Sequence, residues 1–180
     1  MSRAGICSNR AGFTLIELMV VVVLLVLFSA LTVPLLTGVG ADALPLAARR
    51  LAGSVKYLFN EAALSGRPYR LTYDLDGQRY LTQRQEANGE LTAVGGLAGD
   101  RKLGSDVRFE DVTVVGRGKF TSGQVTTVIQ PIGWLEETIV HLQSGRRQLT
   151  LHIQPYTGTT RVYEGYREFD NQSRSVGPGR

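Results

Sequence analysis

The sequence predicts an α+β protein, in which a long N-terminal helix is followed by a second helix packed on antiparallel β-sheet. A nearly unbroken apolar run covers residues 13–36, about the length that a helix needs to cross a bilayer core. Apolar residues then recur at helical spacing between Leu44 and Ala62, and they alternate as in strands from Tyr69 onward. The order of these patterns predicts helix, helix, then strands.

Residues 1–12 are polar and basic, and they read as a short leader. Arg3 and Arg10 precede the apolar run, so the positive-inside rule predicts a cytoplasmic N-terminus and an external domain after residue 36. The single cysteine, Cys7, lies in this leader, so we expect no disulfide in the rest of the chain.

The charge pattern gives no sign of a nucleic-acid groove. The 180 residues carry a formal net charge of +4, and the chain without its leader is nearly neutral. Its basic residues are spread in pairs, such as Arg49-Arg50 and Arg146-Arg147, and are not clustered with aromatic residues. We therefore expect a solvated surface.

A second helix is predicted over residues 44–65. Its apolar residues form one stripe opposite a charged face, so we expect this stripe to pack against the predicted sheet. The segment Ser65-Gly66-Arg67-Pro68 ends it, because glycine suits a helix C-terminus and the residue before proline avoids the helical region. The stripe consists of Leu44, Leu51, Val55, Leu58 and Ala62.

The strands are predicted from alternation and turn residues. Tyr69, Leu71, Tyr73 and Leu75 share one face, and Asp76-Gly77 is the expected hairpin turn. Residues 85–104 contain five glycines and few large apolar residues, which predicts a long loop or irregular connection. We expect residues 170–180 to be a disordered tail. The other predicted strands are 80–84, 107–109, 112–115, 124–130, 138–142, 148–153 (after a Ser144-Gly145 turn) and 161–163.

The run Gly12-Phe13-Thr14-Leu15-Ile16-Glu17-Leu18 resembles the prepilin-type processing signal of type IV pilins and of the pseudopilins of type II secretion. The resemblance implies that a prepilin peptidase cuts between Gly12 and Phe13 and then N-methylates Phe13. Glu17 would then be fifth in the mature chain. Pro34 would stand where many members have a helix-bending proline.

The order of elements resembles the pilin-like fold, a long N-terminal helix whose second half packs on antiparallel sheet. Residues 51–84 and 124–160, with Gln130-Pro131-Ile132-Gly133 and Tyr156-Thr157-Gly158, are similar to H-type minor pseudopilins and FimT-like minor pilins. This resemblance implies a leader at 1–12, a transmembrane and assembly helix at 13–36 and a periplasmic domain at 37–169.

Glu17 is the one charge inside the apolar run. A carboxylate near the centre of a bilayer costs about 2.5–3.5 kcal/mol on insertion scales, so it calls for a partner. When mature subunits stack as a bundle of helices, Glu17 of one can pair with the α-ammonium of Phe13 on its neighbour. We therefore predict an assembly role for Glu17.

No arrangement of residues predicts catalysis, a metal or a cofactor. His141 and His152 lack metal-ligand spacing, and Asp74 and Asp76 lack the other ligands of a calcium loop, so a role in the turn is expected. Glu136-Glu137 cannot act on one atom, because adjacent strand residues point to opposite faces. We expect a protein that is not an enzyme.

The resemblance implies a minor pseudopilin of type II secretion, a structural subunit at or near the tip of the pseudopilus. Its partners would be the prepilin peptidase, other major and minor pseudopilins and inner-membrane lipid, with no small-molecule substrate. We expect a single-pass protein of the bacterial inner membrane, and nucleic acid is not an expected partner.

Three other interpretations stay open. One is a minor pilin of a type IV pilus, including one that binds DNA during uptake. Another is a signal-anchored periplasmic enzyme or binding module. The third is an ordinary secretory signal peptide cut near Ala41-Asp42-Ala43, which has the small-x-small form of such a site.

Overall fold

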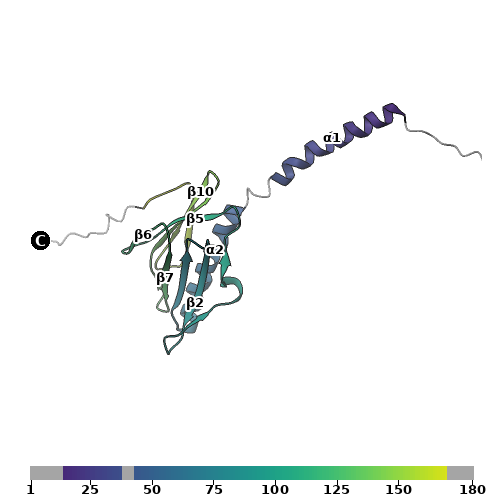
Figure 1. The fold of residues 1–180 in the computed structure, drawn as a ribbon. Coiled ribbons are helices and arrows are strands. Elements are labelled where there is room, and N and C mark those ends of the chain that lie inside the picture. Colours follow the sequence, from purple (N-terminus) through teal and green to yellow (C-terminus); the bar gives the residue numbers. More distant parts are fainter. Residues whose placement is uncertain (1–13, 38–42, 170–180) are drawn as a thin grey trace, which may run out of the picture. The chain divides into compact units, whose positions relative to one another are not determined.

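A computed structural model describes residues 14–37 and 43–169 of the chain, and it divides into two compact units, Met1–Ala41 and Asp42–Arg180 (Figure 1). The first unit contains helix α1 (Leu15–Thr37), which corresponds to the predicted helix at 13–36. Among the residues that the structure describes, no helix combines the length and the apolar character that crossing a membrane requires.

Two antiparallel sheets form most of the second unit. The first has the order β3-β2-β1-β7-β8, with β4 also paired to β2, and the second has the order β11-β10-β9-β5-β6. The first sheet consists of β1 (Tyr69–Asp74), β2 (Arg79–Gln85), β3 (Leu91–Ala93), β4 (Arg101–Lys102), β7 (Gln124–Gln130) and β8 (Trp134–Leu135). The second consists of β5 (Arg108–Val114), β6 (Gly118–Phe120), β9 (Thr138–Ser144), β10 (Arg147–Ile153) and β11 (Thr160–Glu164).

Helix α2 (Ala43–Ser65) packs on strands of both sheets, and this contact forms the core. The predicted apolar stripe is its buried face, and Leu51 and Leu58 are fully buried there. The stripe meets β1 and β7 of the first sheet and β9, β10 and β11 of the second. Between the sheets, the hydroxyls of Thr127 and Thr138 are 2.8 Å apart in a buried hydrogen bond.

The C-terminal half of α2 contacts the turn between β10 and β11 through Lys56 and Phe59. Gly158 in this turn has a φ of 60°, and a Cβ added there would lie 2.4 Å from Cγ of Phe59. Lys56 Nζ donates to the carbonyl oxygen of Thr157 across the same contact, at 2.9 Å. Only glycine therefore fits at position 158.

The long loop or irregular connection predicted at residues 85–104 contains three short elements that the sequence did not predict. This segment contains β3, the 3₁₀ turn η2 (Gly96–Ala98) and β4. Polar contacts with β2 and one small buried residue hold this segment in place. Asp100 Oδ1 accepts the Thr82 N–H at 3.0 Å, and the Thr82 hydroxyl donates to the Ala98 carbonyl. Ala98 itself is fully buried. Because few large apolar residues are involved, the sequence shows no alternation there.

Three smaller predictions also need correction. The two strands expected at 107–109 and 112–115 are one strand, β5, interrupted by a register shift between Phe109 and Asp111. Strand β6 was not predicted, and its three residues are too few for a periodic pattern. The turn between β9 and β10 is Gly145-Arg146 rather than Ser144-Gly145. The tail predicted at 170–180 lies outside the described residues.

Candidate processing and assembly site

The first turn of α1 is organised by Thr14. The Leu18 N–H donates to the Thr14 carbonyl at 3.2 Å, and the Glu17 N–H points at both the Thr14 carbonyl (3.0 Å) and its hydroxyl oxygen (3.4 Å). Thr14 is thus the N-cap residue, and Glu17 is the third residue of the helix. Thr-x-x-Glu is the capping-box spacing, in which the alcohol and the carboxylate both favour a helix start.

Glu17 also lies where the helix dipole favours a negative charge, in the first turn of α1. Its side chain is exposed. Gly12 and Phe13, the predicted cleavage and methylation positions, lie outside the described residues. The local hydrogen bonds therefore fix where the Glu17 backbone stands, one turn from the expected new N-terminus.

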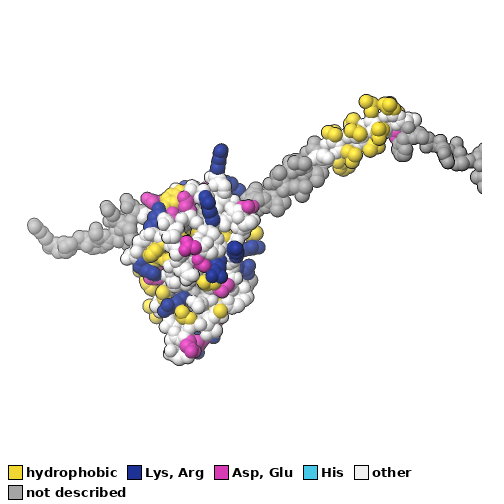
Figure 2. Space-filling model, viewed as in Figure 1, with side chains coloured by type: hydrophobic (Ala, Val, Ile, Leu, Met, Phe, Trp, Pro, Cys, Tyr) yellow, Lys and Arg dark blue, Asp and Glu magenta, His cyan; other side chains and the backbone are white. Residues whose placement is uncertain are grey.

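The rest of α1 presents exposed apolar side chains. Leu15 is 78% exposed and Met19 63% exposed, and large apolar side chains stay exposed as far as Phe28 in the part of α1 whose side chains are described (Figure 2). A helix of this kind is ordinarily covered by lipid or by other apolar helices, because such a surface in water is unfavourable. The described apolar surface of α1 is therefore suited to contact with lipid or with other apolar helices.

In the second unit, a buried polar cluster joins β5 to β9. His141 Nδ1 lies 2.6 Å from Asp111 Oδ1, and His141 Nε2 lies 3.0 Å from the carbonyl oxygen of Arg167. Both partners are acceptors, so both ring nitrogens are satisfied only in the protonated imidazolium. Burial lowers the pKa of His141, but the hydrogen bonds with Asp111 and the Arg167 carbonyl outweigh this and raise the pKa above its ordinary value.

Burial acts in the opposite direction on Asp111. It favours the neutral acid, yet hydrogen bonds from His141 and Tyr166 and the charges of His141 and Lys119 hold the pKa of Asp111 below its ordinary value. Tyr166 Oη donates to Asp111 Oδ2 at 2.9 Å, and its ring stacks on His141 with centroids 3.9 Å apart. The ion pair of Asp111 and His141 is thus the centre of the cluster.

The segment that follows β11, residues 165–169, is held by this cluster, and we call it the strap. The Arg167 N–H donates to the Thr150 hydroxyl at 2.9 Å, and that hydroxyl donates to the Gly165 carbonyl at 2.7 Å. Lys119 contacts Tyr166 and forms an ion pair with Glu168 at 3.2 Å. A cavity of about 350 Å³ lies beside the strap, lined in part by Lys119, His141 and Phe169. The cluster therefore has a structural role, that of fastening the strap.

The other acidic residues singled out in the sequence have separate partners. Asp74 Oδ1 accepts the Gly77 N–H at 2.9 Å, so its predicted turn role is confirmed. Asp76 Oδ2 instead accepts the N–H of Gly123, just before β7, at 3.1 Å. The hydrogen bonds from Gly77 and then Arg79 lower the pKa of Asp74.

Glu136 and Glu137 diverge as predicted. Glu136 Oε2 accepts the Val128 N–H at 2.8 Å in the first sheet, whereas Glu137 Oε1 lies 2.7 Å from Nε2 of His152 in the second. Over residues 14–37 and 43–169, no three side chains of His, Cys, Asp or Glu come together as metal ligands.

The pairing of His141 with Asp111 was missed in the sequence. The two residues stand 30 positions apart, and they meet only through the pairing of β5 with β9. The position of Asp111 could have indicated such a pair. It falls between two predicted strands, and a carboxylate that is buried in a sheet needs a partner. The identity of that partner depended on strand register.

Comparison with known proteins gives one match to a protein family and matches to solved structures. Residues 7–33 match a protein family described as the prokaryotic N-terminal methylation motif. No curated protein sequence matches the chain.

The fold matches two solved structures of the minor pseudopilin EpsH from the type II secretion system of Vibrio cholerae. One is 16% identical with a TM-score of 0.55, and the match covers 68% of this chain and 98% of that one. The other is 14% identical with a TM-score of 0.58, covering 68% and 96%. The expected resemblance is confirmed: the chain combines the prokaryotic N-terminal methylation motif with the pilin-like fold of a minor pseudopilin.

Proposed function

We propose that the chain is a minor pseudopilin of a type II secretion system, a structural and non-enzymatic subunit at or near the tip of the pseudopilus. The observation that carries this proposal is the presence on one chain of the methylation motif and of a domain whose fold matches nearly all of the chain in a solved EpsH structure. Motif and fold support a type II secretion minor pseudopilin or a type IV pilin. The likeness to EpsH favours the first.

In this proposal the prepilin peptidase cuts after Gly12 on the cytoplasmic side and methylates Phe13. The apolar surface of α1 then rests in the inner membrane, with the second unit in the periplasm, until the subunit enters the filament. There, the same surface meets the apolar helices of other major and minor pseudopilins. This accounts for exposed apolar side chains along the described part of α1.

Glu17 sets the register of the subunit in this filament. The Thr14 cap holds Glu17 about one turn from the new N-terminus, so a neighbour displaced along the axis can bring its Phe13 ammonium to the carboxylate. The pairing takes place among apolar helices, where attraction between opposite charges is much stronger than in water. A subunit without the pair would leave a charge buried and alone.

The processing step is tested by the intact mass of the protein extracted from membranes. We expect the loss of residues 1–12 and the addition of one methyl group. Gly12→Val should block both changes, because a branched side chain does not fit a peptidase site shaped for glycine. A mature chain that begins near Leu44 would instead identify an ordinary secretory signal peptide.

The choice between secretion and pilus is tested by deleting the gene in its source organism. We expect the loss of secreted proteins from the medium, with surface pili and DNA uptake unchanged, and rescue by the wild-type gene but not by Gly12→Val. Normal secretion together with lost piliation or DNA uptake would identify a type IV minor pilin and contradict the proposal.

A further inference from the structure

A groove runs along α2 on the side facing the segment at residues 100–104. It consists of two hollows of about 350 and 430 Å³ that share Arg50 and Arg101 in their linings. One wall is a single stripe of α2 between Ala43 and Tyr57, and β4 belongs to the opposite wall. We call this feature the α2 groove.

The α2 groove carries unpaired positive charge. Arg50, Arg101 and Lys102 line it and form no ion pair with any residue that the structure describes. Some basic side chains elsewhere in the domain, such as Arg79, Arg84, Arg117 and Lys119, meet carboxylates. The lining of the groove includes one carboxylate, that of Asp100, which already accepts the Thr82 N–H. The groove is therefore complementary to an anionic partner.

Gly53 is a second, independent feature of the α2 groove. It lies in the interior of α2, where glycine destabilises a helix relative to alanine, and a Cβ added there would meet nothing within 4 Å. Packing of the described residues thus gives no reason for a missing side chain at this position. A partner whose backbone passes close to α2 does give one.

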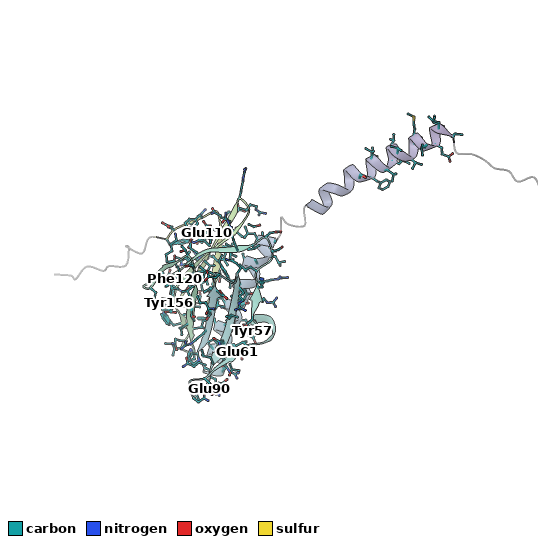
Figure 3. The ribbon with its side chains drawn as sticks, in the orientation of Figure 1. Tyr57, Glu61, Glu90, Glu110, Phe120 and Tyr156 are labelled. Atoms are coloured by element: carbon teal, nitrogen blue, oxygen red, sulfur yellow. The ribbon has the colours of Figure 1, made fainter. Side chains whose placement is uncertain are left out.

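We propose that the α2 groove is a docking site for an acidic segment of a partner protein. Carboxylates of this segment pair with Arg50 and Arg101, and its backbone crosses α2 at Gly53. Tyr57, which is 38% exposed, provides an apolar contact at the end of the stripe (Figure 3). This inference goes beyond the proposed function, since neither the methylation motif nor the pilin-like fold requires such a contact.

A nucleic acid fits the α2 groove less well than an acidic protein. Single-stranded nucleic acids are bound by several aromatic platforms with a continuous basic track, whereas this groove offers Tyr57 as its exposed aromatic side chain. The Asp100 carboxylate in the lining would also repel a phosphate backbone.

The test uses the purified full-length chain in detergent and a fluorescein-labelled decaglutamate peptide as the probe, with binding followed by fluorescence anisotropy at low salt. We expect the double variant Arg50→Gln/Arg101→Gln to bind about tenfold more weakly than the wild type. Gly53→Leu should also weaken binding, while its thermal midpoint stays equal to or above that of the wild type. Arg49→Gln is the matched control, because Arg49 is exposed on α2 but lines neither hollow.

Three results would overturn the proposal. The first is equal affinity of the wild type and the double variant for decaglutamate. The second is a loss in Arg49→Gln as large as that in the double variant, which would indicate unspecific attraction. The third is tighter binding of a single-stranded oligonucleotide of equal charge, which would assign the groove to nucleic acid. None of these results depends on filament assembly, so the test can fail while the proposed secretion function stands.

Discussion

Replacing Gly158 by alanine tests how α2 is held on the strands. The backbone at this position has a φ of 60°, which costs an L-residue about 1–2 kcal/mol. The new Cβ would also lie 2.4 Å from Cγ and 2.7 Å from Cβ of Phe59, and such overpacking typically costs about 1–3 kcal/mol. We therefore expect the free energy of unfolding to fall by about 2–5 kcal/mol.

Two other glycines separate these contributions in urea unfolding experiments on the same chain. Gly145 has a φ of 56° with nothing within 4 Å, so Gly145→Ala should cost only the backbone strain, about 1–2 kcal/mol. Gly53→Ala should raise the free energy of unfolding by roughly 0.8–1 kcal/mol, because alanine is the better helix former and the space is open. If Gly158→Ala and Gly145→Ala cost the same, Phe59 does not press on the turn, and the reasoning is refuted.

Three further perturbations test the core, the strap and the assembly site. Leu58→Ala removes a fully buried side chain and should lower the free energy of unfolding by about 2–5 kcal/mol; an unchanged urea midpoint would contradict the packing of α2. Because the folded-state pKa of His141 is raised, its contribution is present below the unfolded pKa of about 6.5 and is lost as pH rises through the folded value. Hydrogen exchange of the strap amides, corrected for intrinsic rates, should therefore quicken as the pH rises through that folded value, and His141→Gln should remove this dependence. Glu17→Leu should leave membrane insertion and processing intact but strand a neighbour's Phe13 ammonium, a cost of about 3–5 kcal/mol, so crosslinking to partner pseudopilins should fall. Undiminished crosslinking at equal abundance would show that the carboxylate has no role in assembly.

The elements that could be predicted are those with a long periodic pattern between clear turn residues. Helix α2 begins one residue before the predicted 44 and ends at the predicted 65, and β7 has the predicted bounds of 124–130. In both, burial follows the pattern of the sequence, because one face meets the core and the other meets solvent. In contrast, all three side chains of β3 are exposed, so no alternation marks it.

The helix cap formed by Thr14 and Glu17 could be predicted from the sequence, whereas the buried cluster around His141 could not, for a related reason. Thr14 and Glu17 are three residues apart, and one turn of helix brings them together whatever the remainder of the chain does. Asp111, His141 and Arg167 come from β5, β9 and the strap, and they meet only after the second sheet has its final register. The strap itself has no periodic pattern, so its contacts with Thr150 and Lys119 were not foreseen.

The separation into two units decides how assembly mutants can be interpreted. The buried apolar residues of the described chain run from Leu44 to Ile153, and none belongs to residues 14–29, the part of the first unit whose side chains are described. A substitution such as Glu17→Leu therefore removes nothing from the core of the second unit, and its urea midpoint should match that of the wild type. Leu58→Ala should do the reverse, lowering the midpoint while the processing signal and Glu17 stay intact. If both variants lose partner crosslinking equally, the urea midpoint distinguishes the two causes. An unchanged midpoint in Glu17→Leu indicates a missing charge pair, and a lowered midpoint in Leu58→Ala indicates a destabilised domain.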